Sequence, residues 1–405
     1  MGVLERAWLA CKAAPLKKFA GEQMLFGSSL AALAAAYACL ALTAMLLGLR
    51  RSQASQQPQD PPPASILKPL CGAEPRLYEN LRSFCLQDYP HYQIVCGVRD
   101  LNDPAVESVR RLQQEFPALD LELVADPRLH GANYKVSNLI NIFGRCRHDL
   151  LVLADSDIRV TRNYLAEVVA PLHDPSVGIV TCLYRGRPAA GLWSRLGALF
   201  IDDWFASSVW VAHLLGSRDF AFGATIALKR ETLTAVGGFE AIADQLADDY
   251  RLGELTRKRG MRTVLSQHIV TTDVAEADPK SLIEHELRWL RTIRSLQPFG
   301  FMFCFVTFSL PVALIGFLLA IDSLAAQSAL GITAAARLAL HVVQRRRAEQ
   351  PPFAEIGLIA PRDCLNLVLW CASFASWRVR WGRQRFQAEE KGALYEIETE
   401  GSTLI

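Results

Sequence analysis

The stretch Asp149–Val160, DLLVLADSDIRV, decides the fold that we assign to this chain of 405 residues. Its apolar run has the length and composition of a buried strand, and the acids Asp155 and Asp157 end it. Either the acids are simply solvated where the strand reaches the surface, or they form a cation site. Because alternate residues of a strand share a face, we expect Asp155 and Asp157 to point into one site.

Strands and helices alternate on both sides of this stretch, between residues 64 and 298. Short apolar runs typical of strands are separated by segments whose apolar residues recur at helical spacing. The expected strands are 64–70, 92–98, 120–125, 149–157, 178–183 and 224–230, and the expected helices are 74–87, 103–116, 135–146 and 162–170. This alternation predicts an α/β domain with a mostly parallel sheet covered by helices on both faces.

The carboxyl ends of the strands carry the first candidate site. In open α/β sheets, ligands bind just outside these ends. Strand 92–98 is followed by Asp100 and Asp103, and strand 149–157 ends in its own two acids. Acids gathered at one edge repel one another, and a divalent cation such as Mg²⁺, shared with a substrate phosphate, would relieve that repulsion.

Two further polar groups follow along the chain. Asp248 and Asp249 precede a helix-like stretch, where a carboxylate also interacts favourably with the helix dipole and needs no other role. The segment HELRWLRTIR then places His285, Arg288 and Trp289 close together. It can form part of a site, or it can be a basic helix that lies on a membrane surface.

Composition excludes several classes of function. The net charge is only +2, from 43 basic and 41 acidic residues, so no global charge directs the chain to nucleic acid. The ten cysteines show no metal-ligand spacing, which indicates buried small side chains in a reducing compartment.

Apolar residues are concentrated near both ends of the chain. Leu25–Leu49 is uncharged and long enough to cross a bilayer, and it predicts a retained anchor rather than a signal peptide. Phe299–Ile321 is a second clear span. Two weaker candidates are interrupted by charges: 323–343 by Arg337, and 358–376 by Arg362 and Asp363.

The chain is expected to have six parts. They are an N-terminal segment (1–24), an anchor (25–49), a linker (50–63), the α/β domain (64–298), a C-terminal membrane region (299–377) and a basic, aromatic tail (378–405). The membrane region is expected to hold two or three spans, of which 358–376 can be re-entrant. Arg345–Arg347 and the tail are basic, so both are expected on the cytoplasmic side.

The motifs together resemble those of membrane-bound glycosyltransferases with the GT-A fold, and most of all the ceramide glucosyltransferase family, glycosyltransferase family 21. The resemblance runs from about residue 65 to 298. It rests on SILKPLCGAEPRLYENLRSFCLQDYP, VRDLNDPA, HGANYKVSNL, LADSDIRV, GATIALKRETLTAVGGF, LADDYRLG and HELRW. Within the family, IVTCLYRGRPAAGLWSRLGALFIDDWF is similar to the bacterial branch associated with hopanoid biosynthesis.

The resemblance implies an inverting hexosyltransferase. It would move one sugar, N-acetylglucosamine or glucose, from a UDP-sugar to the hydroxyl of a membrane lipid, above all a hopanoid polyol. The alternatives are a ceramide or sphingolipid glucosyltransferase and a processive polysaccharide synthase. A multi-pass enzyme of the inner (cytoplasmic) membrane is expected, with its catalytic domain facing the cytoplasm, where UDP-sugars are made.

The resemblance also assigns roles to residues. Asp100, Lys135 and Asp155 would bind the nucleotide sugar, and Asp157 would hold Mg²⁺ or Mn²⁺ on the diphosphate. Asp249 would be the general base, with Asp248 as the alternative. Arg288 and Trp289, with His285, would hold the diphosphate and shape the acceptor side.

Two departures from the family pattern affect these roles. The third motif reads Asp-Asp where Glu-Asp is commoner, which leaves the choice between Asp248 and Asp249 open. His285 replaces the Gln of processive synthases, which favours transfer of a single sugar. A non-catalytic sensor on this fold would be expected to lack Asp157, Asp249 or Arg288, and all three are present.

A tryptophan-rich stretch, residues 192–215, precedes the third motif. It is either an ordinary core helix or a membrane-dipping wall for the lipid acceptor, because Trp is favoured at membrane interfaces. Asp202 and Asp203 lie within it and receive no role from the sequence.

Overall fold

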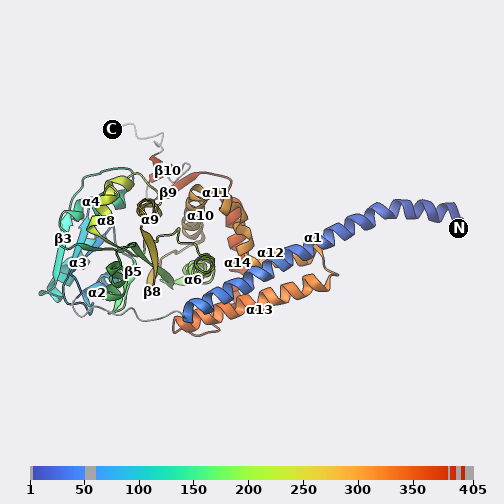
Figure 1. The fold of residues 1–405 in the computed structure, drawn as a ribbon, viewed down its shortest axis with the longest axis horizontal. Coiled ribbons are helices and arrows are strands. Elements are labelled where there is room, and N and C mark those ends of the chain that lie inside the picture. The colour runs from blue at the N-terminus through green and yellow to red at the C-terminus, as the bar shows by residue number, and fades with distance from the viewer. Residues whose placement is uncertain (1–2, 51–60, 382–383, 389–393, 397–405) are drawn as a thin grey trace. The chain divides into compact units, whose positions relative to one another are not determined.

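The computed structural model describes residues 3–50, 61–381, 384–388 and 394–396 (Figure 1). The chain divides into two compact units. The smaller unit contains Met1–Arg50, Asp203–Val211 and Phe299–Cys371, and the larger contains Arg51–Asp202, Ala212–Pro298 and Ala372–Ile405. Most of the predicted linker and much of the predicted tail lie outside the described residues.

The larger unit is built on an eight-stranded sheet in the order β3-β2-β1-β4-β7-β6-β8-β5. β1, β2, β3 and β4 are parallel to one another, as are β6 and β8, whereas β7 runs antiparallel between β4 and β6, and β5 is antiparallel to β8. The strands are β1 (Ala64–Pro69), β2 (Tyr92–Val98), β3 (Asp120–Ala125), β4 (Leu150–Leu153), β5 (Ile158–Arg159), β6 (Val177–Pro188), β7 (Ile226–Lys229) and β8 (Arg262–Val274).

Helices cover both faces of this sheet, because neighbouring strand residues point to opposite sides. Ile66 belongs to one buried apolar cluster and Leu67 to the other. The Ile66 side is covered by α2 (Leu77–Cys85), α3 (Ala105–Glu115) and α5 (Tyr164–Val169), and the Leu67 side by α4 (Tyr134–Phe143), α8 (Arg230–Ala235) and α9 (Asp248–Lys258). The predicted mostly parallel sheet with helices on both faces is confirmed.

The sheet differs from the prediction at the strand expected over residues 149–157. β4 ends at Leu153, the last residue that pairs with β1 and β7, so Asp155 and Asp157 lie in the following turn and not on a strand of residues 149–157. The backbone N–H of Ile158 closes this turn on the carbonyl oxygen of Asp155, at 3.4 Å. The two acids therefore share a site through a turn, and strand alternation is the wrong reason for it.

The sequence patterns missed β8 and β5. β8 reads RTVLSQHIVTTDV, in which polar residues break up the apolar run that identifies a buried strand. The larger unit also contains α6 (Gly191–Leu199), α10 (Pro279–Leu296) and a small sheet of β9 (Arg378–Trp381), β10 (Gln384–Ala388) and β11 (Leu394–Glu396). α10 begins with a capping box, in which Asp278 accepts a hydrogen bond from the backbone N–H of Ser281 at 2.9 Å.

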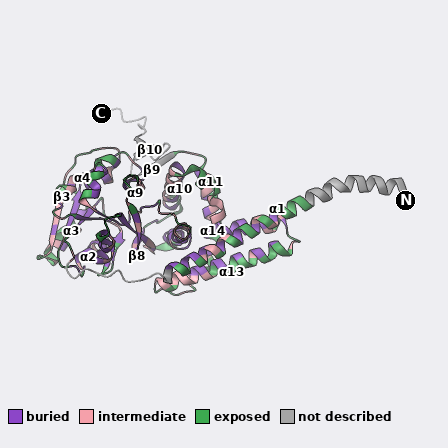
Figure 2. Ribbon diagram, in the orientation of Figure 1, coloured by how far each residue is buried: buried purple, intermediate pink, exposed green. Residues whose placement is uncertain are grey.

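The smaller unit collects apolar helices. Within the part of the chain that the structure describes, three are long and apolar enough to cross a membrane: Gly21–Gly48 within α1 (Val3–Arg50), α13 (Leu324–Arg347) and α14 (Ile356–Ser373). α1 packs along α13 and α12 (Ser309–Leu319) through buried alanines. Figure 2 shows buried and exposed residues alternating along α1 and α13, as expected for helices that pack through one side.

The predicted span Phe299–Ile321 is not one straight helix. It is divided into Pro298–Thr307 and Ser309–Leu319, which meet at 70°, and it adds a fourth span only if this bent pair crosses the membrane. Pro311 explains the break, since a proline clashes with the carbonyl four residues before it, here that of Thr307, and offers it no N–H. By contrast α14, expected as the re-entrant element, is a single helix despite Pro361.

The tryptophan-rich stretch 192–215 is also interrupted. α6 is followed by a π-helical turn, Phe200–Phe205, and then by α7 (Ala206–Leu214). Trp204 stacks on Phe308 at 5.4 Å between ring centroids, and its indole N–H donates to Thr307 Oγ1 at 2.8 Å. The stretch is therefore not one helix, and its role as an acceptor wall stays a prediction.

Candidate active site

Lys135 links two of the predicted acidic motifs. Its Nζ lies 2.6 Å from Asp155 Oδ1 and 3.6 Å from Asp248 Oδ2. The side chain of Asn133 caps α4 by accepting a hydrogen bond from Val136 N at 3.1 Å, which fixes Lys135 in the first turn. Burial alone would lower the pKa of Lys135, but the surrounding carboxylates raise it overall, so the side chain stays charged.

Gly223 marks the point where the predicted residues converge. A Cβ atom at this glycine would lie 3.2 Å from Asp155 Oδ2, 3.2 Å from Lys135 Nζ and 3.4 Å from Asp249 Oδ2. Three residues that are 20 to 114 positions apart in sequence therefore surround one spot. A side chain at Gly223 would clash with these groups. The glycine of the motif GATIAL therefore lets the backbone come close to all three side chains.

Asp249 is held by backbone groups on both carboxylate oxygens. Oδ2 accepts a hydrogen bond from Gly223 N at 2.8 Å, and Oδ1 accepts one from Tyr250 N at 2.7 Å. Burial and the neighbouring Asp248 carboxylate raise the pKa of Asp249 from 3.8 to about 6. Such a group is ionised at neutral pH and still basic enough to accept a proton.

Asp157 has the environment of a cation ligand. Its Oδ2 accepts a hydrogen bond from Thr272 Oγ1 at 2.6 Å, and burial together with the Asp155 charge raises its pKa from 3.8 to about 7. Within the described ranges, no group of three or more His, Cys, Asp or Glu side chains is arranged to hold a metal ion alone. The two aspartates nevertheless fit a cation whose remaining ligands are phosphate oxygens and water, since carboxylate oxygens are the hard donors that such a cation prefers.

The HELRW residues lie in the same region. Burial lowers the pKa of Arg288, whereas the charges of Asp155, Asp248 and Asp249 act to raise it, so the guanidinium lies within electrostatic range of all three. The ring of Trp289 contacts that of His285 at 4.9 Å between centroids. His285 Nδ1 is hydrogen-bonded to the buried carboxylate of Glu276.

Asp100 lies apart from this group. It is exposed at the end of β2, where its Oδ1 accepts hydrogen bonds from Asn102 N at 2.9 Å and Asn102 Nδ2 at 3.0 Å. β1 separates β2 from β4 in the sheet. Asp103 serves a structural purpose, because its carboxylate accepts from Gly72 N and Ala105 N.

Sequence reasoning missed Lys68, Gly223, Thr272 and Glu276. Lys68 is fully buried in β1, its Nζ donates to the carbonyl oxygen of Asp155, and it lies 4.0 Å from the centroid of the Phe84 ring. Burial lowers the pKa of Lys68 from 10.5 to about 8. The sequence did contain a signal for Lys68, namely a lysine inside the apolar run ASILKP. A lysine in a buried strand is almost never fully buried without a specific partner.

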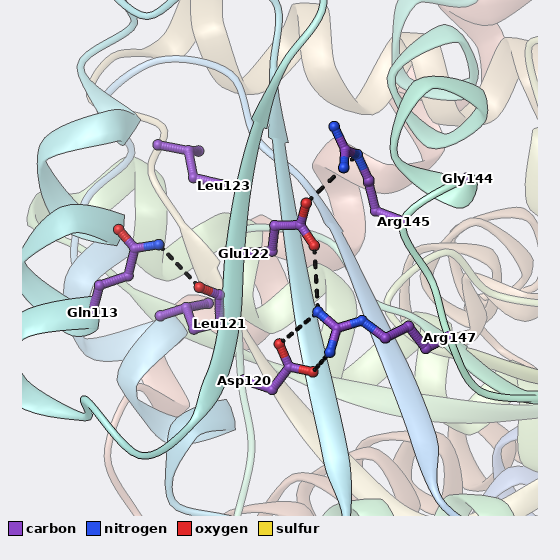
Figure 3. A pocket seen from close by; sticks show the side chains of 8 residues that line it. All are labelled: Gln113, Asp120, Leu121, Glu122, Leu123, Gly144, Arg145 and Arg147. Carbon is purple, nitrogen blue, oxygen red and sulfur yellow. Dashed lines mark hydrogen bonds and ion pairs between the residues drawn. The ribbon is translucent and has the colours of Figure 1, made fainter.

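An open pocket of about 660 Å³ lies elsewhere, near the start of β3 (Figure 3). It is at the amino ends of the parallel strands, opposite the edge that carries Asp155. Arg147 pairs with Asp120 at 2.7 Å and Glu122 at 3.7 Å, and Arg145 with Glu122 at 3.5 Å. These paired charges cover an edge strand, which protects it against pairing with another chain.

Comparison with known proteins gives a family match. Residues 28–394 match the family model described as Glycosyl transferase family 21. Ceramide glucosyltransferase 3 of Caenorhabditis elegans is 26% identical over 242 residues, which are 58% of this chain and 52% of that protein. The ceramide glucosyltransferase of Gibberella zeae is 26% identical over 162 residues, 35% of this chain and 30% of its own. This chain therefore spans about half, or less, of the length of these relatives.

Among solved structures, a mannosyltransferase from Pyrobaculum calidifontis in complex with GDP-Man and Mn²⁺ is 20% identical, with a TM-score of 0.48, over 85% of this chain and 97% of that one. Together with the sheet described above, the family match confirms the expected GT-A fold with apolar helices near both ends.

Proposed function

We propose that this chain, which belongs to glycosyl transferase family 21, moves one sugar from a UDP-sugar to the hydroxyl of a membrane lipid. The observation that carries the proposal is the convergence of Asp155, Lys135 and Asp249 around Gly223. It brings a cation for phosphate, acids for a metal ion and a basic carboxylate into one place, as transfer from a nucleotide sugar requires.

Asp249 is the base in this proposal. Its carboxylate takes the proton of the lipid hydroxyl as the oxygen attacks the anomeric carbon and UDP departs. Asp248 is less suited, because its carboxylate lies 3.6 Å from Lys135 and shares that positive charge. One base without an enzyme nucleophile implies direct displacement with inversion, so an α-linked donor gives a β-glycoside.

The departing diphosphate needs positive charge. Lys135, which is paired with Asp155, and Arg288, which lies within electrostatic range of the acids, supply it from the chain. Asp157 and Asp155 would hold the Mg²⁺ or Mn²⁺ expected from the sequence, which, when bound, would neutralise phosphate charge. Asp100 would contact the uracil or ribose end of the donor, and Trp289 and His285 the acceptor side.

The relatives bear on the choice of lipid. Proteins named ceramide glucosyltransferase favour a ceramide-like acceptor and a glucose donor over the hopanoid polyol that the sequence resemblance put first. We therefore propose a ceramide-like acceptor, with a hopanoid polyol as the alternative. His285 in place of Gln favours single transfer over a processive synthase. The apolar helices suit an enzyme of the cytoplasmic membrane whose larger unit faces the cytoplasm.

The test is a transfer assay with the full chain in lipid nanodiscs. Supplied with UDP-glucose and ceramide, the protein should form a monoglucosyl lipid with a β-linkage, identified by mass spectrometry and NMR. Asp249→Asn should reduce the rate by about 10²- to 10⁴-fold, because the base is lost while the volume is kept. Asp174→Asn is the matched control, since Asp174 is half-exposed and paired with Arg262. Full activity of Asp249→Asn would refute the assignment of the base.

A further inference from the structure

The apolar helices of the smaller unit contain a buried network of charged side chains. Arg337 of α13 donates two hydrogen bonds to Asp363 of α14, at 2.7 and 2.8 Å. Its Nη2 also lies 3.5 Å from Asp203 Oδ2, which in turn is 2.9 Å from His341 Nδ1. These four residues had no role in the sequence analysis, where Arg337 and Asp363 only weakened two predicted spans.

The geometry places a proton on His341 Nε2. This nitrogen lies 2.9 Å from the carbonyl oxygen of Ala354, which only accepts hydrogen bonds, and Nδ1 faces the Asp203 carboxylate. The proton of the second hydrogen bond is shared by His341 and Asp203, which together carry no net charge. With Arg337 paired to Asp363, the four side chains sum to zero charge.

Two polar atoms of the network have no partner. Asp203 Oδ1 and Arg337 Nη1 are buried without a hydrogen-bond partner, in residues that are only 3% and 7% exposed. One unpaired atom is an acceptor and the other a donor. Leaving such groups unpaired in an apolar setting is unfavourable, and ionisable residues inside apolar helices commonly mark a functional site.

The backbone around Asp203 is itself unusual. Asp203 lies in the π-helical turn Phe200–Phe205, between α6 and α7. Such turns insert an extra residue into a helix and are frequent at functional sites. In an uninterrupted helix Asp203 would take a different angular position, so the turn determines that its carboxylate meets Arg337 and His341.

We propose that Asp203 and Arg337 bind the polar head of a neutral lipid that presents a hydrogen-bond donor and an acceptor side by side. A hydroxyl or amide N–H satisfies Asp203 Oδ1, and a carbonyl or hydroxyl oxygen satisfies Arg337 Nη1. Zero net charge in the network matches a neutral head group. The inference deepens the proposed function, on which it rests, by giving the acceptor a binding site.

The position of the site along α13 suits a lipid that enters from the interface. Arg337 is eight residues from Arg345, where the basic end of the helix begins, and this corresponds to about 12 Å along the axis. Both a ceramide, with its amide and hydroxyls, and a hopanoid polyol, with neighbouring hydroxyls, present the required pair of groups.

The experiment measures lipid binding without UDP-sugar, using the full chain in nanodiscs and a short-chain fluorescent ceramide, with a hopanoid polyol as competitor. The double variant Asp203→Asn/Arg337→Gln keeps the net charge and should weaken ceramide binding about tenfold. Arg337→Lys keeps the charge but removes Nη1. It replaces the double variant in the binding assay if the double variant does not fold. Arg345→Gln/Glu355→Gln, which removes a 3.0 Å ion pair between α13 and the residue before α14, is the matched control and should bind as the wild type does.

The outcomes separate the two proposals. The site is supported if the Asp203 and Arg337 variants bind ceramide more weakly and the control variant does not. If the hopanoid polyol competes with ceramide, the site also binds polyols. Unchanged ceramide and polyol binding in folded variants, with only a lower melting temperature, overturns the inference and leaves a structural ion network. A wild-type protein that binds lipid but transfers no sugar refutes the proposed function and not this site.

Discussion

At the scale of single residues, the surroundings of Asp249 decide its chemistry. Two backbone N–H groups hold its oxygens, while burial and Asp248 raise its pKa to about 6. The carboxylate is thus ionised above that pH and a neutral acid below it. An exposed aspartate with a pKa near 3.8 would remain ionised but would be a weaker base.

This environment predicts how transfer depends on pH. Because the folded pKa of Asp249 lies at about 6, kcat/KM measured at saturating Mg²⁺, which would keep Asp157 ionised, should be level near pH 7.5 and should fall about tenfold per unit as the pH drops below 6. The measurement is the initial rate of glycolipid formation between pH 4.5 and 8, with circular dichroism to confirm that the fold persists. A rate that stays level down to pH 4.5 contradicts the assignment.

Most site residues could be predicted from motifs, but their contacts could not. The structure brings Lys135, Asp155 and Asp249 together around Gly223, whereas the roles that the motifs give them stay predictions. Lys68 was missed because it looks like part of an ordinary strand, and its contact with Asp155 depends on β1 and β4 lying side by side.

At the scale of elements, helix packing in the smaller unit depends on glycine. α1 and α12 approach so closely that a Cβ at Gly316 would lie 2.6 Å from the carbonyl oxygen of Gly27 and 2.6 Å from the backbone nitrogen of Ala31. These are backbone atoms, which cannot move without shifting a helix. Small residues at such contacts are how apolar helices pack inside a membrane.

This contact predicts a destabilised variant. Gly316→Ala should lower stability by about 1–3 kcal/mol, because the added methyl group forces α1 and α12 apart. Thermal unfolding in detergent, followed by tryptophan fluorescence, measures the effect. Gly331→Ala in α13 is the control, since a Cβ there meets nothing within 4 Å. Equal melting temperatures for the two variants would argue against close packing of α1 on α12.

Element types were predicted well where the apolar pattern was regular and poorly where it was not. β1 and β2 are short continuous apolar runs, and the first helices have apolar residues at helical spacing. β8 was missed because its buried positions hold Thr, Ser and His, which form hydrogen bonds inside the fold, such as that from Thr272 to Asp157. The bend after Thr307 was missed because hydropathy measures only how apolar a segment is and does not show that Pro311 breaks a helix.

At the scale of the whole molecule, the chain combines an α/β unit with a unit of apolar helices. The proposed reaction joins a water-soluble donor to a lipid, so it needs both. The family match covers both units, from residue 28 to 394.

The proposed orientation can be measured through Cys71, an exposed free cysteine of the larger unit. If this unit faces the cytoplasm, a membrane-impermeant maleimide at pH 8 should label Cys71 in inverted membrane vesicles but not in intact cells. The label is assigned by its loss in Cys71→Ser. Labelling of Cys71 in intact cells would place the larger unit on the outer side.

The sequence by itself determined the α/β class, the apolar helices near both ends and the family motifs, because these depend on local periodicity, residue type and order. Only the tertiary structure decided which side chains share a site. Contacts between residues about 100 positions apart in sequence depend on strand order and helix packing. It moved Asp155 and Asp157 from a strand into a turn, and it placed two backbone N–H groups on the Asp249 carboxylate. It also gathered Asp203, Arg337, His341 and Asp363 into one network, although the sequence had shown Arg337 and Asp363 only as charges that interrupt apolar segments.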